Sequence, residues 1–118
     1  MSQFQSQLQL VASIAEREML RYTPAGIPIV SARLLHSSQQ TEAGIERLVE
    51  FEIAALAAGE ISGRFNRLEL GSALCFTGFL ARKSRNSKSL VFHIIDLALR
   101  LTIVAAHLIY TGATNGIR

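Results

Sequence analysis

The chain has 118 residues, of which 49% are hydrophobic and 18% are charged, with a formal net charge of +3. This composition predicts one compact domain with an apolar core and excludes an intrinsically disordered chain. The longest apolar segment, residues 97–110, contains Arg100 and is shorter than the roughly 20 residues of a membrane-spanning helix. Cys75 is the only cysteine, which excludes an intramolecular disulfide, and no leader peptide is visible. We therefore expect a cytoplasmic protein with no membrane association.

Short segments in which apolar and polar residues alternate are typical of half-buried strands. In chain order, this pattern predicts strands at residues 8–17, 29–38, 47–53, 73–81 and 90–97. A tight turn is predicted within "TPAGIP", residues 23–28, where Gly26 follows two residues after Pro24. Residues 39–46 are predicted to be a polar connection. A short helix or turn-rich segment is predicted near residues 58–67, because the glycines in this region disfavour a long helix.

The same alternation predicts which side chains face the core. The expected inward residues are Leu8, Leu10, Ala12, Ile14, Val30, Ala32, Leu34, Val49, Phe51, Ile53, Leu74, Phe76, Leu80, Leu90, Phe92 and Ile94. Gly78 interrupts the fourth predicted strand and is expected at a bend or bulge. Apolar residues also occur at outward positions, namely Leu35, Leu48, Phe79, Val91 and Ile95. A monomer that exposed all of them would carry an unusual apolar patch.

Five short strands with one helical segment between the third and the fourth are the element order of an oligonucleotide/oligosaccharide-binding (OB) barrel. The predicted fold class is therefore all-β, with a five-stranded OB-fold barrel over residues 1–97. An immunoglobulin-type sandwich would need about seven strands. Residues 98–118 are predicted to be an apolar C-terminal extension, compatible with a helix, an added strand or an end without a selected role.

The positive charge is concentrated in one segment. Residues 82–88, here called the basic segment, contain Arg82, Lys83, Arg85 and Lys88 and no acid, and without them the chain would be slightly acidic. In the OB arrangement this segment joins the last two strands and is one of two loops that grip nucleic acid. Flexible cations beside serine hydroxyls favour phosphates over bases, which predicts single-strand binding with weak sequence preference. Alternatively, the charges only protect a solvated hairpin from aggregation.

The sequence has no pattern that is typical of an enzyme or a metal site. His36, His93 and His107 are far apart and do not have metal-ligand spacing. No glycine-rich phosphate loop follows a strand, and no Gly-x-Ser-x-Gly nucleophile motif is present. We expect no catalytic activity, no metal and no cofactor.

Three segments, "RYTPAGIP", "EAGIER" and "GFLARKSRNSKSLVFHI", resemble the primosomal replication protein N (PriB) family, small bacterial relatives of single-stranded DNA-binding protein. The resemblance covers roughly residues 7–97. It implies a homodimer of barrels that binds single-stranded DNA and acts in replication restart beside the primosomal helicase and other primosome proteins. By position, it implies DNA contacts at Arg21, Lys83, Arg85 and Lys88. With their neighbours, the predicted nucleic-acid site comprises Arg21, Tyr22, Arg82, Lys83, Arg85 and Lys88.

The sequence departs from the family pattern at two positions. Ile45 and Glu50 occupy positions at which the best-known members have base-stacking aromatic residues. Glu50 would repel phosphate, so we expect weak binding, with Tyr22 and Phe79 as the main remaining stacking candidates. The alternative function is a protein adaptor that docks a helicase and retains only vestigial DNA binding. An RNA-binding barrel of the cold-shock type is disfavoured because its aromatic-rich strands are missing.

Overall fold

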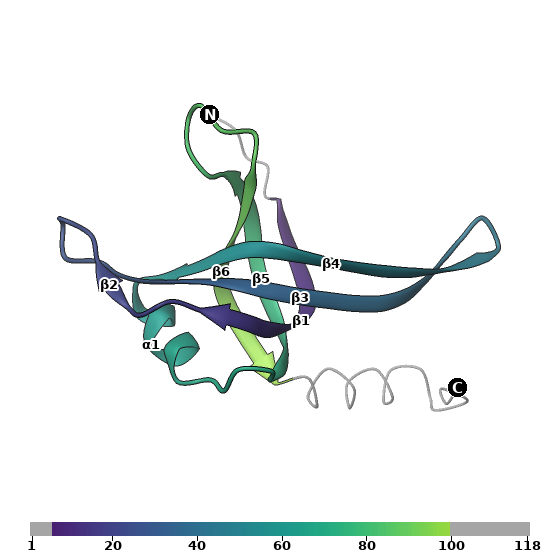
Figure 1. Cartoon of the computed structure of the whole chain (residues 1–118), viewed down its shortest axis with the longest axis horizontal. Coiled ribbons are helices and arrows are strands. Elements are labelled where there is room, and N and C mark those ends of the chain that lie inside the picture. The colour runs from purple at the N-terminus through teal and green to yellow at the C-terminus, as the bar shows by residue number, and fades with distance from the viewer. Residues whose placement is uncertain (1–5, 100–118) are drawn as a thin grey trace.

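The computed structural model describes residues 6–99, which form a mostly β structure with one short helix (Figure 1). Its elements are β1 (Gln7–Arg17), β2 (Arg21–Tyr22), β3 (Pro28–Glu42), β4 (Ile45–Ala58), α1 (Glu60–Asn66), β5 (Ala73–Arg82) and β6 (Leu90–Leu99). The helix lies between the third and fourth long strands, as predicted. The expected C-terminal extension lies outside the described residues from residue 100 onward.

The five long strands form a closed circuit of pairings. The sheet order is β1-β5-β6-β4-β3-β2, and an additional β1–β3 pairing returns the sheet to its first strand. All pairings are antiparallel except β4 with β6. Closure gives β1 and β3, which would otherwise be open edges, a hydrogen-bonded neighbour. This pairing pattern is that of a barrel, in agreement with the sequence prediction.

β1 serves two neighbours because it bends. Its first part, Gln7 to Ser13, pairs with β5, whereas its last part, Ser13 to Arg17, pairs with β3. The register with β3 shifts between Ile14 and Glu16, which marks a bulge. Since a bulge bends its strand and increases the local twist, β1 can follow the sheet around the barrel.

The core has the composition that the alternation predicted. Leu10, Ala12, Ile14, Val30, Ala32, Leu34, Leu74, Phe76, Phe92 and Ile94 are all buried. Phe65 of α1 joins them and meets the Phe76 ring edge-on, with centroids 6.0 Å apart. The buried hydroxyl of Ser62 donates to the carbonyl oxygen of Gly59 at 2.6 Å. Burial raises the pKa of the Cys75 thiol. No helix among residues 6–99 is long and apolar enough to cross a membrane.

The inward prediction was wrong near the ends of β1, β5 and β6 and in the hairpin part of β4. Leu8, Phe51, Leu80 and Leu90 are between 37% and 49% exposed, and Val49 is only half-buried, whereas the half-buried Ile53 packs against the core as predicted. Val91, predicted to face outward, is only 7% exposed. The strands extend beyond the closed part of the barrel. There the barrel core no longer determines which face of the strand is covered, so alternation no longer indicates burial.

The prediction of a polar connection at residues 39–46 was also wrong. β3 and β4 continue as a hairpin that projects from the barrel, and only Ala43 and Gly44 form its turn (Figure 1). These two residues have φ angles of 56° and 78°. Two positive φ values in a two-residue loop are the hallmark of a type I′ turn, whose twist matches that of the flanking strands.

The predicted irregularity at Gly78 is confirmed. The β5–β6 register shifts between Thr77 and Gly78, where the two strands approach closely. A Cβ atom at Gly78 would collide with the carbonyl oxygen of His93 and would lie 2.9 Å from Cζ of Phe92. Only glycine fits this close approach without movement of the β6 main chain.

We therefore expect Gly78→Ala to lower the free energy of unfolding by about 1–3 kcal/mol through overpacking. Urea denaturation followed by circular dichroism measures the change. Gly63→Ala is the control, since its Cβ would lie 3.8 Å from Nη1 of Arg67, an ordinary contact. Alanine within a helix is also favoured over glycine by about 0.5–1 kcal/mol. Equal stabilities of the two variants would contradict the close approach at Gly78.

Candidate nucleic-acid interface

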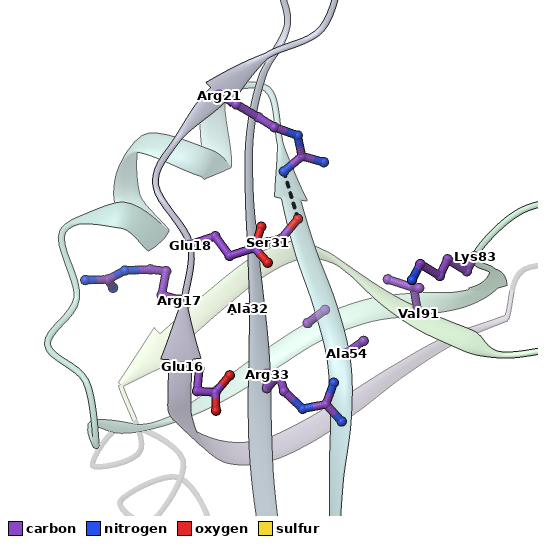
Figure 2. Close-up of a pocket in the computed structure, with 11 residues that line it drawn as sticks. Glu16, Arg17, Glu18, Arg21, Ser31, Ala32, Arg33, Ala54, Lys83 and Val91 are labelled. Atoms are coloured by element: carbon purple, nitrogen blue, oxygen red, sulfur yellow. Dashed lines mark hydrogen bonds between the residues drawn. The ribbon is translucent and has the colours of Figure 1, made fainter.

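An open groove of about 570 Å³ lies between the β1–β3 connection and the base of the basic segment (Figure 2). Its charged lining comes from Glu16, Arg17, Glu18, Arg21, Arg33 and Lys83, and small residues, including Ala32 and Ala54, contribute to its floor. A second hollow of about 360 Å³ shares Arg33 and Lys83 with the first and extends to Ser89 and Leu90. The two hollows together form one groove that crosses β3 and β4.

The predicted turn places Arg21 at one end of this groove. β2 pairs with the start of β3 through Arg21–Ile29 and Tyr22–Pro28. The main-chain N–H of Gly26 donates to the carbonyl oxygen of Thr23 at 2.8 Å, with Gly26 at a φ angle of 86°. The Arg21 guanidinium donates to Oγ of Ser31 at 3.0 Å, which directs it over β3 (Figure 2). The turn prediction is confirmed.

The basic segment belongs to a loop that is closed by its own hydrogen bonds. The N–H of Lys83 donates to the carbonyl oxygen of Ser89 at 2.9 Å, and the N–H of Ser87 donates to that of Ser84 at 3.1 Å. The cations of this segment are exposed, and none of them forms an ion pair with another residue in the 6–99 range. Their charge is therefore locally uncompensated.

The structure brings together only part of the predicted site. Arg21 and Lys83 line the same groove, from opposite sides. Tyr22 is 69% exposed beside Arg21, yet it is not part of the lining. Arg82, Arg85 and Lys88 also lie outside the lining, on the strand end and loop next to Lys83.

Sequence reasoning missed most of the charged groups of the groove, among them Glu16, Glu18, Arg33 and Glu52. Glu16 and Glu18 contribute carboxylates from β1 and from the residue that follows it. Arg33 lines both hollows, and its Nε lies 3.2 Å from Oε1 of Glu52. Alternation along β3 could have indicated Arg33, because residues 31 and 33 share the outer face of this strand. Ser31 is the hydrogen-bond partner of Arg21 on that face.

Arg17 is counted among the lining residues but is engaged elsewhere. Its guanidinium points away from the other labelled side chains of Figure 2 and donates to the carbonyl oxygens of Phe65, at 3.1 Å, and Leu68. These carbonyls lie at and just beyond the end of α1, where the last carbonyls of a helix lack partners within it. Arg17 therefore fastens α1 to β1.

The stacked aromatic pairs lie outside the groove lining. Phe79 stacks on His93 with ring centroids 4.8 Å apart, and Phe51 stacks on His36 at 4.9 Å. Phe51 is thus a partly exposed hairpin residue, which corrects its assignment to the core, whereas Phe92 is buried. No aromatic side chain is among the described residues that line the two hollows. No group of three potential metal ligands occurs within residues 6–99.

The groove is thus a mixed-charge channel with cations at both ends and no stacking platform. Such a channel can hold the phosphates of a flexible chain, because guanidinium and ammonium groups donate charge-assisted hydrogen bonds to phosphate oxygens.

Known structures place the fold in a defined class. The small single-stranded DNA-binding protein of Streptomyces coelicolor superposes with a TM-score of 0.64 at 15% identity, over 86% of this chain and 97% of that one. At this identity the likeness concerns the fold alone, which is the OB fold of single-stranded DNA-binding proteins.

More similar proteins narrow the assignment. A family model described as "Another single-strand binding protein family" matches residues 6–96. The replication restart protein PriB of Nitrosomonas europaea is 42% identical over 91 residues, which are 77% of this chain and 84% of that protein. The structure of PriB from Ralstonia solanacearum has a TM-score of 0.75 at 49% identity, over 81% of this chain and 98% of that one.

The chain belongs to the PriB family of replication restart proteins, within this single-strand binding family. This membership confirms the resemblance carried by the three sequence segments. It also agrees with the expectation that the protein is not an enzyme.

Arg17 and Arg21, two of the arginines that line the groove, should differ in their effect on stability. Arg17→Gln removes charge-assisted hydrogen bonds to the end of α1 and should lower the free energy of unfolding by about 1.5–3 kcal/mol. Arg21→Gln changes an exposed side chain and should stay within about 0.5 kcal/mol of the parent. Urea denaturation of both variants compares them, and equal losses would contradict the structural role of Arg17.

Proposed function

We propose that this protein binds single-stranded DNA across the groove and the basic segment, as an accessory protein of the replication-restart primosome. The observation that carries the proposal is the position of the uncompensated charge. All four cations of the basic segment lack ion-pair partners among residues 6–99, and Lys83 connects them to a groove that ends at Arg21. OB folds bind oligonucleotides on this strand face and between these two loops.

The geometry favours single strands over duplex DNA. The one described helix has seven residues and carries Glu60 in its first turn, so it is a poor candidate for a major-groove recognition helix. An open groove with flexible cations suits an exposed phosphate backbone. Contacts of this kind carry little sequence information, so the proposed binding has weak sequence preference.

The acidic lining should keep the affinity moderate. Glu16 and Glu18 border the first hollow and Glu52 borders the second. With no aromatic platform in the groove, the stacking energy that other single-strand binders use, about 1–3 kcal/mol per base, is not supplied there. Phosphate contacts at Arg21, Tyr22 and the basic segment then provide most of the binding.

The relatives are bacterial replication restart proteins, and this supports further parts of the proposal. The protein acts in the cytoplasm as a homodimer and assists the primosomal helicase together with other primosome proteins. Residues 1–97 form the binding domain, and residues 98–118 are an extension to it.

A protein adaptor is the second candidate function, and the projecting hairpin favours it. Glu46, Glu50 and Glu52 share one face of β4 with exposed Leu48, and their cross-strand partners on β3 include exposed Leu35. This face is acidic and partly apolar, so it repels DNA and suits a protein partner. An adaptor that docks its helicase through the basic segment would lose helicase binding, but not DNA binding, when that segment is neutralised.

The proposed DNA binding should depend on salt. If Arg21, Lys83, Arg85 and Lys88 each neutralise one phosphate, log K should fall with log salt concentration with a slope of about −3, from roughly −0.7 per contact on single strands. Fluorescence anisotropy with a labelled oligothymidylate measures this slope. Replacing Arg85 and Lys88 with Gln should weaken binding several-fold and flatten the slope by about 1.4.

The matched control replaces Arg47 and Arg67 with Gln. Both residues are exposed and lie outside the groove lining, and the change in net charge is the same. This control should bind almost as tightly as the parent. A slope near zero for the parent, or equal effects of the two double variants, would refute the proposed site.

We also expect sedimentation analysis at micromolar concentration to give a homodimer of about twice the 12.9 kDa chain mass. Leu35, Leu48, Phe79 and Ile95 are exposed, as the outward parity predicted, although Val91 is not. Exposed apolar residues of this number favour burial against a second copy. A monomer across this concentration range would contradict the dimer.

A further inference from the structure

Arg33 lies where the two hollows of the groove meet. It belongs to β3 and, among residues 6–99, is the only arginine that lines both hollows, as Lys83 is the only lysine. Arg21 lies on one side of it, and its hydrogen-bond partner Ser31 is two residues away on the same face of β3. Arg21, Arg33 and Lys83 all line the first hollow, and Figure 2 shows Arg33 beyond Ser31 as seen from Arg21, so a phosphate chain that follows β3 through the groove can contact Arg33.

The pairing register explains why Glu52 reaches the same guanidinium. Arg33 is directly opposite Ala54 on β4, and Glu52 lies two residues along that strand on the same face. Diagonal neighbours of this kind are within reach of long side chains. Nε of Arg33 and Oε1 of Glu52 are 3.2 Å apart, and the two side chains are 46% and 50% exposed.

We propose that Arg33 is a phosphate contact of the groove and that Glu52 competes with DNA for its guanidinium. The pair thereby sets the affinity of the site. This inference rests on the proposed single-strand binding. It adds Arg33, a phosphate contact on the barrel face, to the contacts of the loops. It also adds Glu52, a carboxylate that weakens this contact.

The competition is physically balanced. A half-exposed ion pair is weak because solvent and salt screen it. A phosphate offers the guanidinium bidentate hydrogen bonds that a carboxylate also offers, so the two anions exchange readily. When phosphate occupies Arg33, the displaced Glu52 carboxylate stays close and repels it. Arg21 differs, because its partner Ser31 is neutral and opposes no phosphate.

The other neighbouring acids form no ion pair with Arg33 among residues 6–99, although Glu16 is directly opposite Arg33 in the β1–β3 register. Glu16 and Glu18 both line the first hollow. Glu50 is on the same face of β4, farther along the hairpin, and Ser37 Oγ donates to it at 3.4 Å. Glu52 is thus the carboxylate that is placed to compete.

A double-mutant cycle tests the inference. The variants are Glu52→Gln, Arg33→Gln and the two together, and the probe is a fluorescein-labelled oligothymidylate of about 30 nucleotides, long enough for two OB folds. Glu52→Gln should tighten binding about three- to tenfold and steepen the salt slope by less than about 0.7, the value of one full phosphate contact, because Arg33 already makes part of this contact in the parent. Arg33→Gln should weaken binding several-fold. In the Arg33→Gln background, Glu52→Gln should give less than half of its effect in the parent, measured as the change in log K.

Glu42→Gln is the matched control. Glu42 is paired with Arg47 at 2.7 Å near the hairpin turn, with side chains 68% and 63% exposed, and it lies outside the groove lining. This substitution makes the same change in net charge and breaks the same kind of pair. It should leave DNA affinity and salt slope unchanged. Thermal unfolding of every variant verifies that the fold is retained.

The outcomes separate this inference from the proposed function. If the parent binds DNA and the Arg85/Lys88 variant binds less, but Glu52→Gln and Arg33→Gln change nothing, the function stands and this inference is wrong. Equal gains from Glu52→Gln with and without Arg33, or an equal gain from Glu42→Gln, would show a general charge effect and would also overturn it. If no variant binds DNA, Glu52→Gln included, both proposals fail.

Discussion

The pairing of β1 with two different neighbours is the constraint on which the remaining structure depends. β1 pairs with β5 over its first part and with β3 over its last part. The bulge between Ile14 and Glu16 makes this double pairing possible. Because β1 then ends against β3, the N–H of Glu18 donates to the carbonyl oxygen of Ser31 at 2.9 Å. That contact holds Glu16 and Glu18 beside β3, and β2 follows directly. One wall of the groove is therefore a consequence of barrel closure.

The opposite wall depends on a second irregularity. The close approach of β5 and β6 at Gly78 fixes how the two strands run toward the basic segment. Their ends are joined by the Lys83–Ser89 hydrogen bond, which places Lys83 at the groove while the other loop cations stay in solvent. Each wall is thus positioned by main-chain hydrogen bonds.

The alternation of apolar and polar residues predicted the barrel well, because it arises where one face of a strand is covered by the core. Alternation was correct for residues such as Leu10, Ile14 and Phe76, which lie under the closed sheet. It failed at Phe51 and Leu80, because alternation does not indicate where along a strand the covered region ends.

The polar stretch at residues 39–46 misled for a related reason. A hairpin that projects into solvent needs few apolar residues on its faces, so its composition resembles that of a loop. The site was predictable in its loops, where unusual charge density and the turn motif stand out locally. The Arg33–Glu52 pair was not, because it depends on the β3–β4 register between residues 19 positions apart.

The distribution of charge separates binding from folding. On the strands and the helix, Arg33, Arg47 and Arg64 each lie within 4.0 Å of a carboxylate, and Arg17 is committed to the end of α1. Removing any of these leaves a group of the fold without its partner. The cations of the basic segment have no such partner among residues 6–99, so their number can change with little effect on the packed barrel. It follows that substitutions in the loop can change the affinity for a phosphate chain without breaking a contact of the fold. On the barrel face, a cation such as Arg33 is already paired with a carboxylate. A phosphate that binds there must replace a contact within the protein.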